Sequence, residues 1–182
     1  MDELLSRHSV ACGGFTAIVR QADGKWGNPS PCPEWSARNV VEHVIGFHDV
    51  LVLRPMGTKP TRPKEDPEAR WLVTQPAIIS TLEEALRADP DTFPLGPKVK
   101  VHRLVPMLTV EMLVHTWDLA RAIGVDPYLD EQQCRIALET VTPDVERLDT
   151  KMFGPTVHAA DDSDAGRALV AVLGRDPDWT SH

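Results

Sequence analysis

The stretch LTVEMLVHTWDLARAIG, Leu108 to Gly124, decides the fold. Apolar residues recur along it at every third or fourth position, which predicts a buried helix, and Gly124 stands where a helix takes a left-handed C-terminal cap. The same stretch places Glu111 and His115 one turn apart on its apolar face. A buried carboxylate is costly without a compensating positive charge, so this pair needs a partner.

The size and composition of the chain favour one helical domain. Of its 182 residues 42% are hydrophobic but only 5% are aromatic, and Leu, Val and Ala supply most of the apolar bulk. This balance favours packed helices over a β-sandwich, and the length suits a single core. We therefore expect residues 1–182 to form one all-α domain.

Charge and cysteine content exclude several classes of function. A formal net charge of −8 argues against nucleic acids and anionic membranes as partners, because both require clustered Lys and Arg. No apolar run is long enough to span a bilayer and no secretion signal begins the chain, so we expect a cytoplasmic protein. The three cysteines include no C-x-x-C pair, which predicts reduced thiols. Cys32 is expected to be a small buried residue, with a reactive role as the alternative.

Capping signals and helix breakers predict six helices. Ser36 and Asp130 are suited to cap helix N-termini, and Gly124 and Gly174 to close helix C-termini. The Pro-rich, charged residues 54–70 are expected to form a flexible connection with their basic side chains in solvent. The predicted helices cover approximately residues 4–20, 37–53, 77–88, 102–124, 131–141 and 164–173.

Helical spacing also predicts which side chains face the core. Val10 is a candidate core residue of the first helix, and a row in the second helix runs from Val40 through His43 to Val50. His48 follows His43 by five positions, which turns its side chain well around the helix. We therefore expect His43 inside the protein and His48 at its surface.

His43 is the third residue needed to make Glu111 and His115 a metal site. A catalytic zinc ion takes three protein ligands and keeps one position open for water or substrate. A second interpretation involves no metal: Glu111 and His115 bond only to each other, and His43 is an ordinary core histidine. Spacing alone leaves both interpretations open.

Asp118 lies one turn beyond His115 in the same predicted helix. Its carboxylate is placed to orient the His115 imidazole, or to contribute a further ligand. The alternative is a salt bridge with Arg121 or Arg38. We expect the neighbouring Trp117 to pack in the core.

Three motifs in order resemble a known family: WGNPSPCPEWSARNVVEHVIG (Trp26 to Gly46), EMLVHTWDLARAIG (Glu111 to Gly124) and GRDPDW (Gly174 to Trp179). The chain resembles the actinobacterial family related to the N-terminal domain of mycothiol-dependent maleylpyruvate isomerase, in the DinB-like, YfiT-like superfamily of metalloenzymes. The resemblance implies an up-down-down-up four-helix bundle with short additional C-terminal helices. It also implies a divalent metal at one end of the core, held by the residues that match His43, Glu111 and His115.

The resemblance implies an enzyme of the mycothiol-dependent isomerase or S-transferase type, in which the metal activates a low-molecular-weight thiol or water. We expect zinc, with nickel as the alternative, and mycothiol as cosubstrate. The isomerase has an additional C-terminal domain that helps form its active site, whereas this chain stops soon after the bundle, so we expect a reaction other than maleylpyruvate isomerisation. The alternative function is a non-catalytic metal- or ligand-binding module, a sensor or partner-binding protein. A homodimer is the alternative to a monomer.

Overall fold

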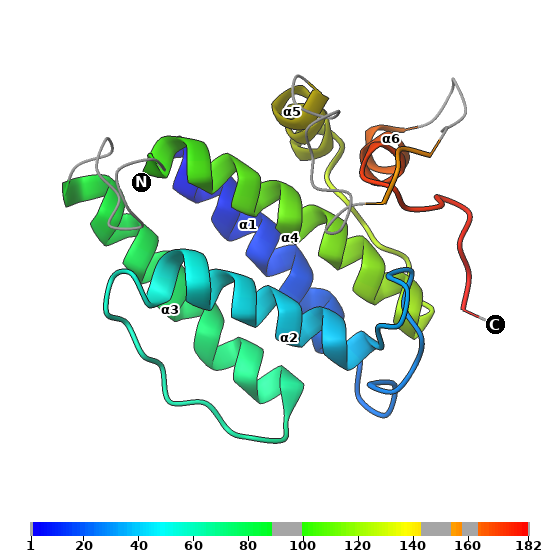
Figure 1. Ribbon diagram of the computed structural model, residues 1–182, viewed down its shortest axis with the longest axis horizontal. Helices are drawn as coiled ribbons and strands as arrows, with labels where there is room; N and C mark the ends of the chain where they lie inside the picture. The colour runs from blue at the N-terminus through cyan, green and yellow to red at the C-terminus, as the bar shows by residue number, and fades with distance from the viewer. Residues whose placement is uncertain (1, 89–99, 143–153, 158–163, 182) are drawn as a thin grey trace.

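The computed structural model describes residues 2–88, 100–142, 154–157 and 164–181 (Figure 1). Within these ranges the chain forms six α-helices, one π-helical turn and no strand, which confirms the all-α prediction. None of the helices in this part of the chain combines the length and the apolar character needed to cross a membrane. The elements are α1 (Glu3–Val19), α2 (Ala37–His48), η1 (Asp49–Leu53), α3 (Pro67–Ala88), α4 (Val101–Ile123), α5 (Glu131–Val141) and α6 (Ala165–Val172).

Helices α1 to α4 form a four-helix bundle. Both α1 and α2 pack against α3 and against α4, which places α1 and α2 diagonally across the bundle. Figure 1 shows that α1 and α4 run in one direction while α2 and α3 run in the other, so the predicted up-down-down-up order is confirmed. The short helices α5 and α6 pack against each other and against α4. Because α4 contacts all the other α-helices, it is the central element of the fold.

The ends of α2 and α4 are held by the local interactions that the sequence predicts. Ser36 caps α2, its side chain accepting a hydrogen bond from the backbone of Asn39. Gly124 closes α4 in the left-handed conformation, at φ 72°. The loop before α2 is fastened to this same end, because Lys25 Nζ donates to the Ile123 carbonyl at 2.9 Å. The loop is therefore held against the helix that carries Glu111.

Helix α3 begins at Pro67, well before its predicted start. Pro67 occupies the first turn, where a missing N–H costs nothing, and the Asp66 carboxylate caps that turn. Pro76 is unfavourable inside a helix by local rules, but the helix continues through it. Trp71 explains why: its ring is fully buried and its Nε1 donates to Thr16 Oγ1 at 2.8 Å. The prediction was wrong because tertiary packing outweighs the local cost of proline.

Two arginines that were expected in solvent bind carboxylates of α2 and η1 instead. Arg62, in the Pro-rich segment, forms two hydrogen bonds with Asp49 at 2.9 and 2.6 Å. Arg70, which the structure places in the first turn of α3, bonds to Glu42 at 2.8 Å. These pairs tie α2 and η1 to the segment that follows them.

Three side chains have the opposite burial to the one predicted. Val10 and Val50 are 58% and 54% exposed, whereas His48 is fully buried. For Val50, the cause is the π-helical turn, whose larger number of residues per turn breaks the predicted row. His48 does point well away from His43, but toward α1, where its ring lies 5.5 Å from that of His8. Both directions are interior because α2 has neighbours on more than one side.

Candidate metal centre

His43, Glu111 and His115 come together between α2 and α4. His115 Nε2 lies 3.1 Å from Glu111 Oε2, and His43 Nε2 lies 4.0 Å from the same oxygen. One ligand atom from each residue falls within a group no wider than 4.8 Å. The one-turn spacing of Glu111 and His115 aims both side chains at one point, and the packing of α2 on α4 brings His43 to it. The group is compatible with a divalent metal.

One side of this group opens into a cleft of about 450 Å³. Glu111 and His115 are almost completely buried, but the His43 side chain is 28% exposed. Substrate must reach a catalytic metal site, whereas a structural metal site can be closed. The open cleft therefore favours a catalytic metal site over a structural one. The loop before α2 contributes Pro31, Cys32, Pro33 and Trp35 to the walls, and the C-terminal part contributes Gly154, Pro155, Gly174 and Arg175.

Aromatic rings hold the His43 imidazole in place. The ring centroid of Trp35 lies 4.7 Å from that of His43, and the ring of Phe47 lies 6.0 Å away on the same helix. Trp35 is itself positioned by a closed loop, in which its carbonyl accepts a hydrogen bond from the Ser30 N–H at 2.9 Å. Burial is the main cause that lowers the pKa of His43 to about 4, and the nearby His115 lowers it further. The ring is therefore neutral at neutral pH, which is the form that binds a metal.

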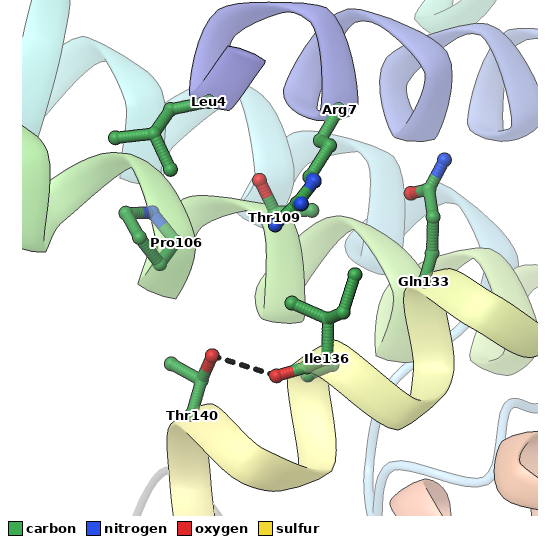
Figure 2. Close-up of a pocket in the computed structure, with 8 residues that line it drawn as sticks. Leu4, Arg7, Pro106, Thr109, Gln133, Ile136 and Thr140 are labelled. Atoms are coloured by element: carbon green, nitrogen blue, oxygen red, sulfur yellow. Dashed lines mark hydrogen bonds between the residues drawn. The ribbon is translucent and has the colours of Figure 1, made fainter.

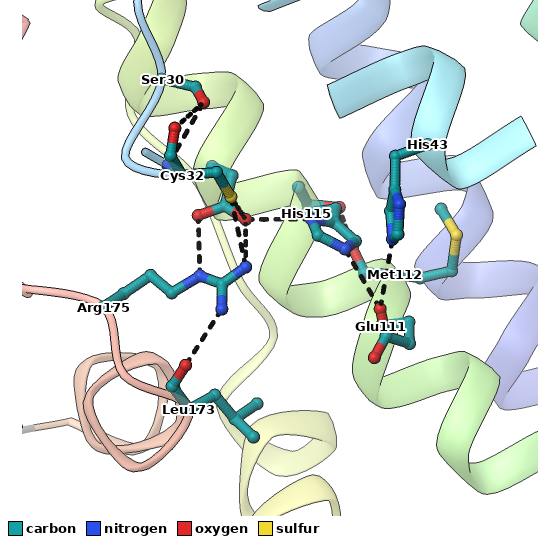
Figure 3. A network of polar contacts seen from close by, with 10 residues as sticks. Ser30, Cys32, His43, Glu111, Met112, His115, Leu173 and Arg175 are labelled. Carbon is teal, nitrogen blue, oxygen red and sulfur yellow. Dashed lines mark hydrogen bonds and ion pairs between the residues drawn. The ribbon is translucent and has the colours of Figure 1, made fainter. Parts of the chain in front are cut away.

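Asp118 orients the second imidazole, as the sequence predicts for a supporting carboxylate. His115 Nδ1 donates to Asp118 Oδ2 at 2.9 Å, which leaves Nε2 facing Glu111 (Figure 3). Burial alone would lower the pKa of His115, but hydrogen bonds with Asp118, Cys32 and Glu111 together raise it well above the ordinary value. Without a metal the ring is therefore protonated, and a metal must displace the proton from Nε2.

Arg175 completes the network and was not predicted from the sequence. Its Nε and Nη2 donate to the two oxygens of Asp118, at 3.2 and 3.0 Å, and the residue is only 6% exposed. Burial would raise the pKa of Asp118, but Arg175 and His115 lower it to about 2, so the carboxylate is ionised. The alternative prediction, a salt bridge of Asp118 with Arg121 or Arg38, was wrong, because the partner of Asp118 is Arg175. The one signal was that Arg175 falls within the motif GRDPDW.

Cys32 belongs to the same network. Its Sγ donates to Asp118 Oδ2 at 3.2 Å and accepts from Arg175 Nη2 at 3.3 Å. Cys32 is buried, as expected, and burial raises the pKa of its thiol. With His115 and Asp118 it forms a second group of compatible ligand atoms, but the Arg175 guanidinium already neutralises that carboxylate and repels a further cation. The group that contains His43 is therefore the better candidate.

The loop before α2 and the first ligand helix also carry a match to a known family. Residues 9–70 match the mycothiol maleylpyruvate isomerase N-terminal domain. The resemblance inferred from the motifs is confirmed over this segment. The matched residues include His43 and the Trp35 loop, and they stop before Glu111 and His115.

Two proteins are similar to this chain in sequence over almost its whole length. Both are proteins of Mycobacterium tuberculosis, "Uncharacterized protein MT0763" of strain CDC 1551 / Oshkosh and "Uncharacterized protein Rv0738" of strain H37Rv. Each is 29% identical over 189 residues, which cover 96% of this chain and 98% of the relative. No solved structure matches the chain. The similarity therefore extends well beyond residues 9–70, the segment of the family match.

Proposed function

We propose that the protein is a metal-dependent enzyme of the mycothiol-dependent isomerase or S-transferase type, acting on a low-molecular-weight thiol. The observation that carries this proposal is the group of His43, Glu111 and His115 at the inner wall of an open cleft. The match of residues 9–70 to a mycothiol-related domain supports the thiol as the substrate class.

The residues present fit a divalent metal, with zinc as first choice and nickel as the alternative. Two imidazoles and one carboxylate are a donor set that zinc takes in catalytic sites, and His43, Glu111 and His115 would hold it. The buried Glu111 carboxylate also calls for a compensating positive charge. When bound, the metal lowers the pKa of a thiol or water in its open position, so that a nucleophile forms at neutral pH.

The chain's own residues prepare this site. Asp118 fixes the ring orientation of His115 and directs its Nε2 toward Glu111, while Arg175 keeps Asp118 ionised. Trp35 and the prolines beside Cys32 form a largely apolar wall, which excludes water from the region next to the ligand group. The cleft therefore offers a thiol a site that is oriented and partly desolvated.

We also propose that residues 1–182 act as one domain in a reducing, cytoplasmic compartment. The packing of α5 and α6 on α4, and the contact of Arg175 with Asp118, support a single unit. The three cysteines are buried free thiols, which supports a compartment in which thiols stay reduced.

The test is a conjugation assay with purified protein, mycothiol and an electrophilic acceptor, in the presence and absence of zinc or nickel. We expect the rate to depend on the metal and to be lost in His115→Ala, but to be retained in His102→Ala, whose histidine is exposed on the same helix. Metal binding without any thiol-dependent turnover would contradict the proposal. It would favour the non-catalytic binding module instead.

A further inference from the structure

The wall of the metal cleft offers few side-chain partners to a polar substrate group. Apart from the candidate ligands, the described residues that line the cleft are three prolines, Trp35, two glycines, Cys32 and Arg175. This lining includes no Ser, Thr, Asn, Gln, Tyr or Lys. A polar group that enters such a cleft loses its hydrogen bonds to water and regains few from the wall, which costs binding free energy. The wall therefore favours an apolar substrate group.

The fold does not impose this kind of lining on every cavity. A smaller cavity of about 160 Å³ lies between α1, α4 and α5, and its lining includes Arg7, Thr109, Gln133 and Thr140 (Figure 2). Polar side chains therefore do line another cavity of the same helices. The apolar wall is a property of the metal cleft itself.

The one side chain in the cleft wall with a permanent positive charge is already engaged. All three nitrogens of the Arg175 guanidinium donate within the protein: Nε and Nη2 to Asp118, Nη2 also to Cys32 Sγ, and Nη1 to the Leu173 carbonyl at 3.0 Å (Figure 3). A negatively charged substrate group would have to displace the ionised Asp118 carboxylate to reach this guanidinium. The wall therefore disfavours an anionic substrate group.

Trp35 gives the apolar wall a flat aromatic surface beside the candidate ligands. Its half-buried ring lies 4.7 Å from the ring of His43 and 6.3 Å from that of His115. Aromatic rings pack favourably against such a surface in offset or edge-on arrangements. An apolar cavity of about 150 Å³ holds benzene. The cleft of about 450 Å³ therefore has room for one ring and for the sulfur end of a thiol.

We propose that the acceptor of the thiol is an uncharged aryl electrophile whose ring packs against Trp35. This inference rests on the proposed function and names the second substrate of the same site. In the conjugation, the thiol sulfur forms a bond to the electrophilic carbon, for example that of a benzylic halide. The carbon–halogen bond breaks, the halide leaves with the bonding electrons, and the thiol proton passes to water.

The experiment measures binding separately from turnover. The full-length, zinc-loaded protein is titrated with methyl phenyl sulfone and with benzenesulfonate, and binding is followed by NMR at the backbone amide of Gly174, which lines the cleft. The two compounds have the same ring and nearly the same size, but only benzenesulfonate is charged, and its weakly basic oxygens make it a poor zinc ligand. We expect saturable binding of the sulfone and about tenfold weaker binding of benzenesulfonate. Equal or tighter binding of benzenesulfonate, or no saturable binding of the sulfone, would overturn the inference.

The conjugation assay separates this inference from the proposed function. Metal-dependent conjugation in a protein that prefers benzenesulfonate would overturn the inference and leave the proposed function standing. Preference for the sulfone without any thiol-dependent turnover would overturn the proposed function, and with it the assignment of the ring as a substrate.

Two pairs of variants locate the ring and test the role of charge. Trp35→Leu should weaken binding of the sulfone about fivefold, whereas Trp179→Leu, outside the lining of the cleft, should leave it unchanged. Pro155→Lys adds an ammonium group to the exposed rim and should strengthen binding of benzenesulfonate about threefold relative to Thr156→Lys, at the exposed neighbouring position. Unchanged sulfone binding in a folded Trp35→Leu protein would contradict the position of the ring. The comparison of the two compounds on the wild type stands if Trp35→Leu does not fold.

Discussion

Arg175 supports the candidate metal centre without being one of its proposed ligands. Its guanidinium binds Asp118, and Asp118 in turn holds the His115 ring. Sequence spacing predicted His43, Glu111 and His115 because each follows a helical repeat that is visible locally. It could not predict Arg175, which meets Asp118 across 57 residues of chain. Contacts of that range are decided by how α6 packs on α4, and no local pattern records this.

Replacing Arg175 by Gln tests this supporting role. The variant loses the charge that keeps Asp118 ionised, so His115 is less firmly oriented and metal affinity should fall about 10- to 100-fold. The measurement is a competition titration of zinc against a chromophoric chelator. Arg167→Gln is the matched control, because Arg167 lies nearby in α6 but pairs with exposed Asp178. Equal affinity in Arg175→Gln and Arg167→Gln would show that Arg175 has no influence on the metal.

His48 makes stability depend on pH. Burial lowers its pKa to about 4, below the value of 6.5 for an exposed histidine, so the unfolded chain takes up a proton at a higher pH than the folded chain does. The contribution of neutral His48 to the free energy of unfolding is therefore fully present above pH 6.5 and is lost as pH falls from 6.5 to 4. At about 1.4 kcal/mol for each pKa unit, the loss between pH 7 and pH 5 is roughly 2 kcal/mol.

Urea unfolding of the metal-free protein at pH 7 and pH 5 measures this effect. His48→Gln removes the titrating group. Between pH 7 and pH 5, the free energy of unfolding of this variant should therefore decrease by roughly 2 kcal/mol less than that of the wild type. Lys59→Gln, a change in the exposed connection, should follow the wild type. Identical pH dependence in His48→Gln and the wild type would show that His48 is not a buried neutral histidine.

At the scale of the elements, the ends of helices were more predictable than their interiors. Ser36, Asp130 and Gly124 act through neighbours only a few residues away, so their caps could be read from the sequence and are confirmed. The start of α3 could not be predicted from the sequence. Pro76 disfavours a helix by local rules, but the tertiary packing of Trp71 outweighs that local cost. The π-helical turn that follows α2 left no local signal either.

The close approach of Gly154 and Gly174 fixes the C-terminal wall of the cleft. Gly174 has φ 79°, and a Cβ there would lie 2.4 Å from the backbone of Gly154. Gly174→Ala should therefore cost at least twice as much unfolding free energy as Gly124→Ala. At Gly124, with φ 72°, a Cβ meets nothing within 4 Å, so only the left-handed strain of about 1 kcal/mol applies.

Chemical denaturation of the two alanine variants gives this comparison directly. Gly174→Ala should also weaken metal binding, because it displaces the segment that carries Arg175. Gly124→Ala, at the end of α4, should leave metal binding unchanged. Equal costs for the two substitutions would contradict the close backbone contact.

At the scale of the whole molecule, the bundle brings candidate ligands from different helices to one point. Composition and spacing were sufficient to predict an all-α fold, and the resemblance added the order of the helices. Because the proposed ligands sit on α2 and α4, a metal held by them would link two elements of the core and stabilise the folded state alone. Zinc at 100 times its dissociation constant should add about 2.7 kcal/mol to the free energy of unfolding. Thermal unfolding with and without zinc measures this gain, and its absence in the wild type would show that the two helices share no metal.

The most direct measurement is the metal content of tag-free protein, purified without chelator or added metal, beside the His43→Ala, Glu111→Ala and His115→Ala variants. We predict close to one divalent metal per wild-type chain and its loss in all three variants, because each removes one of three ligands. A wild-type protein that is free of metal and takes up neither zinc nor nickel would contradict the account. Glu111 and His115 would then serve only to satisfy each other in the core.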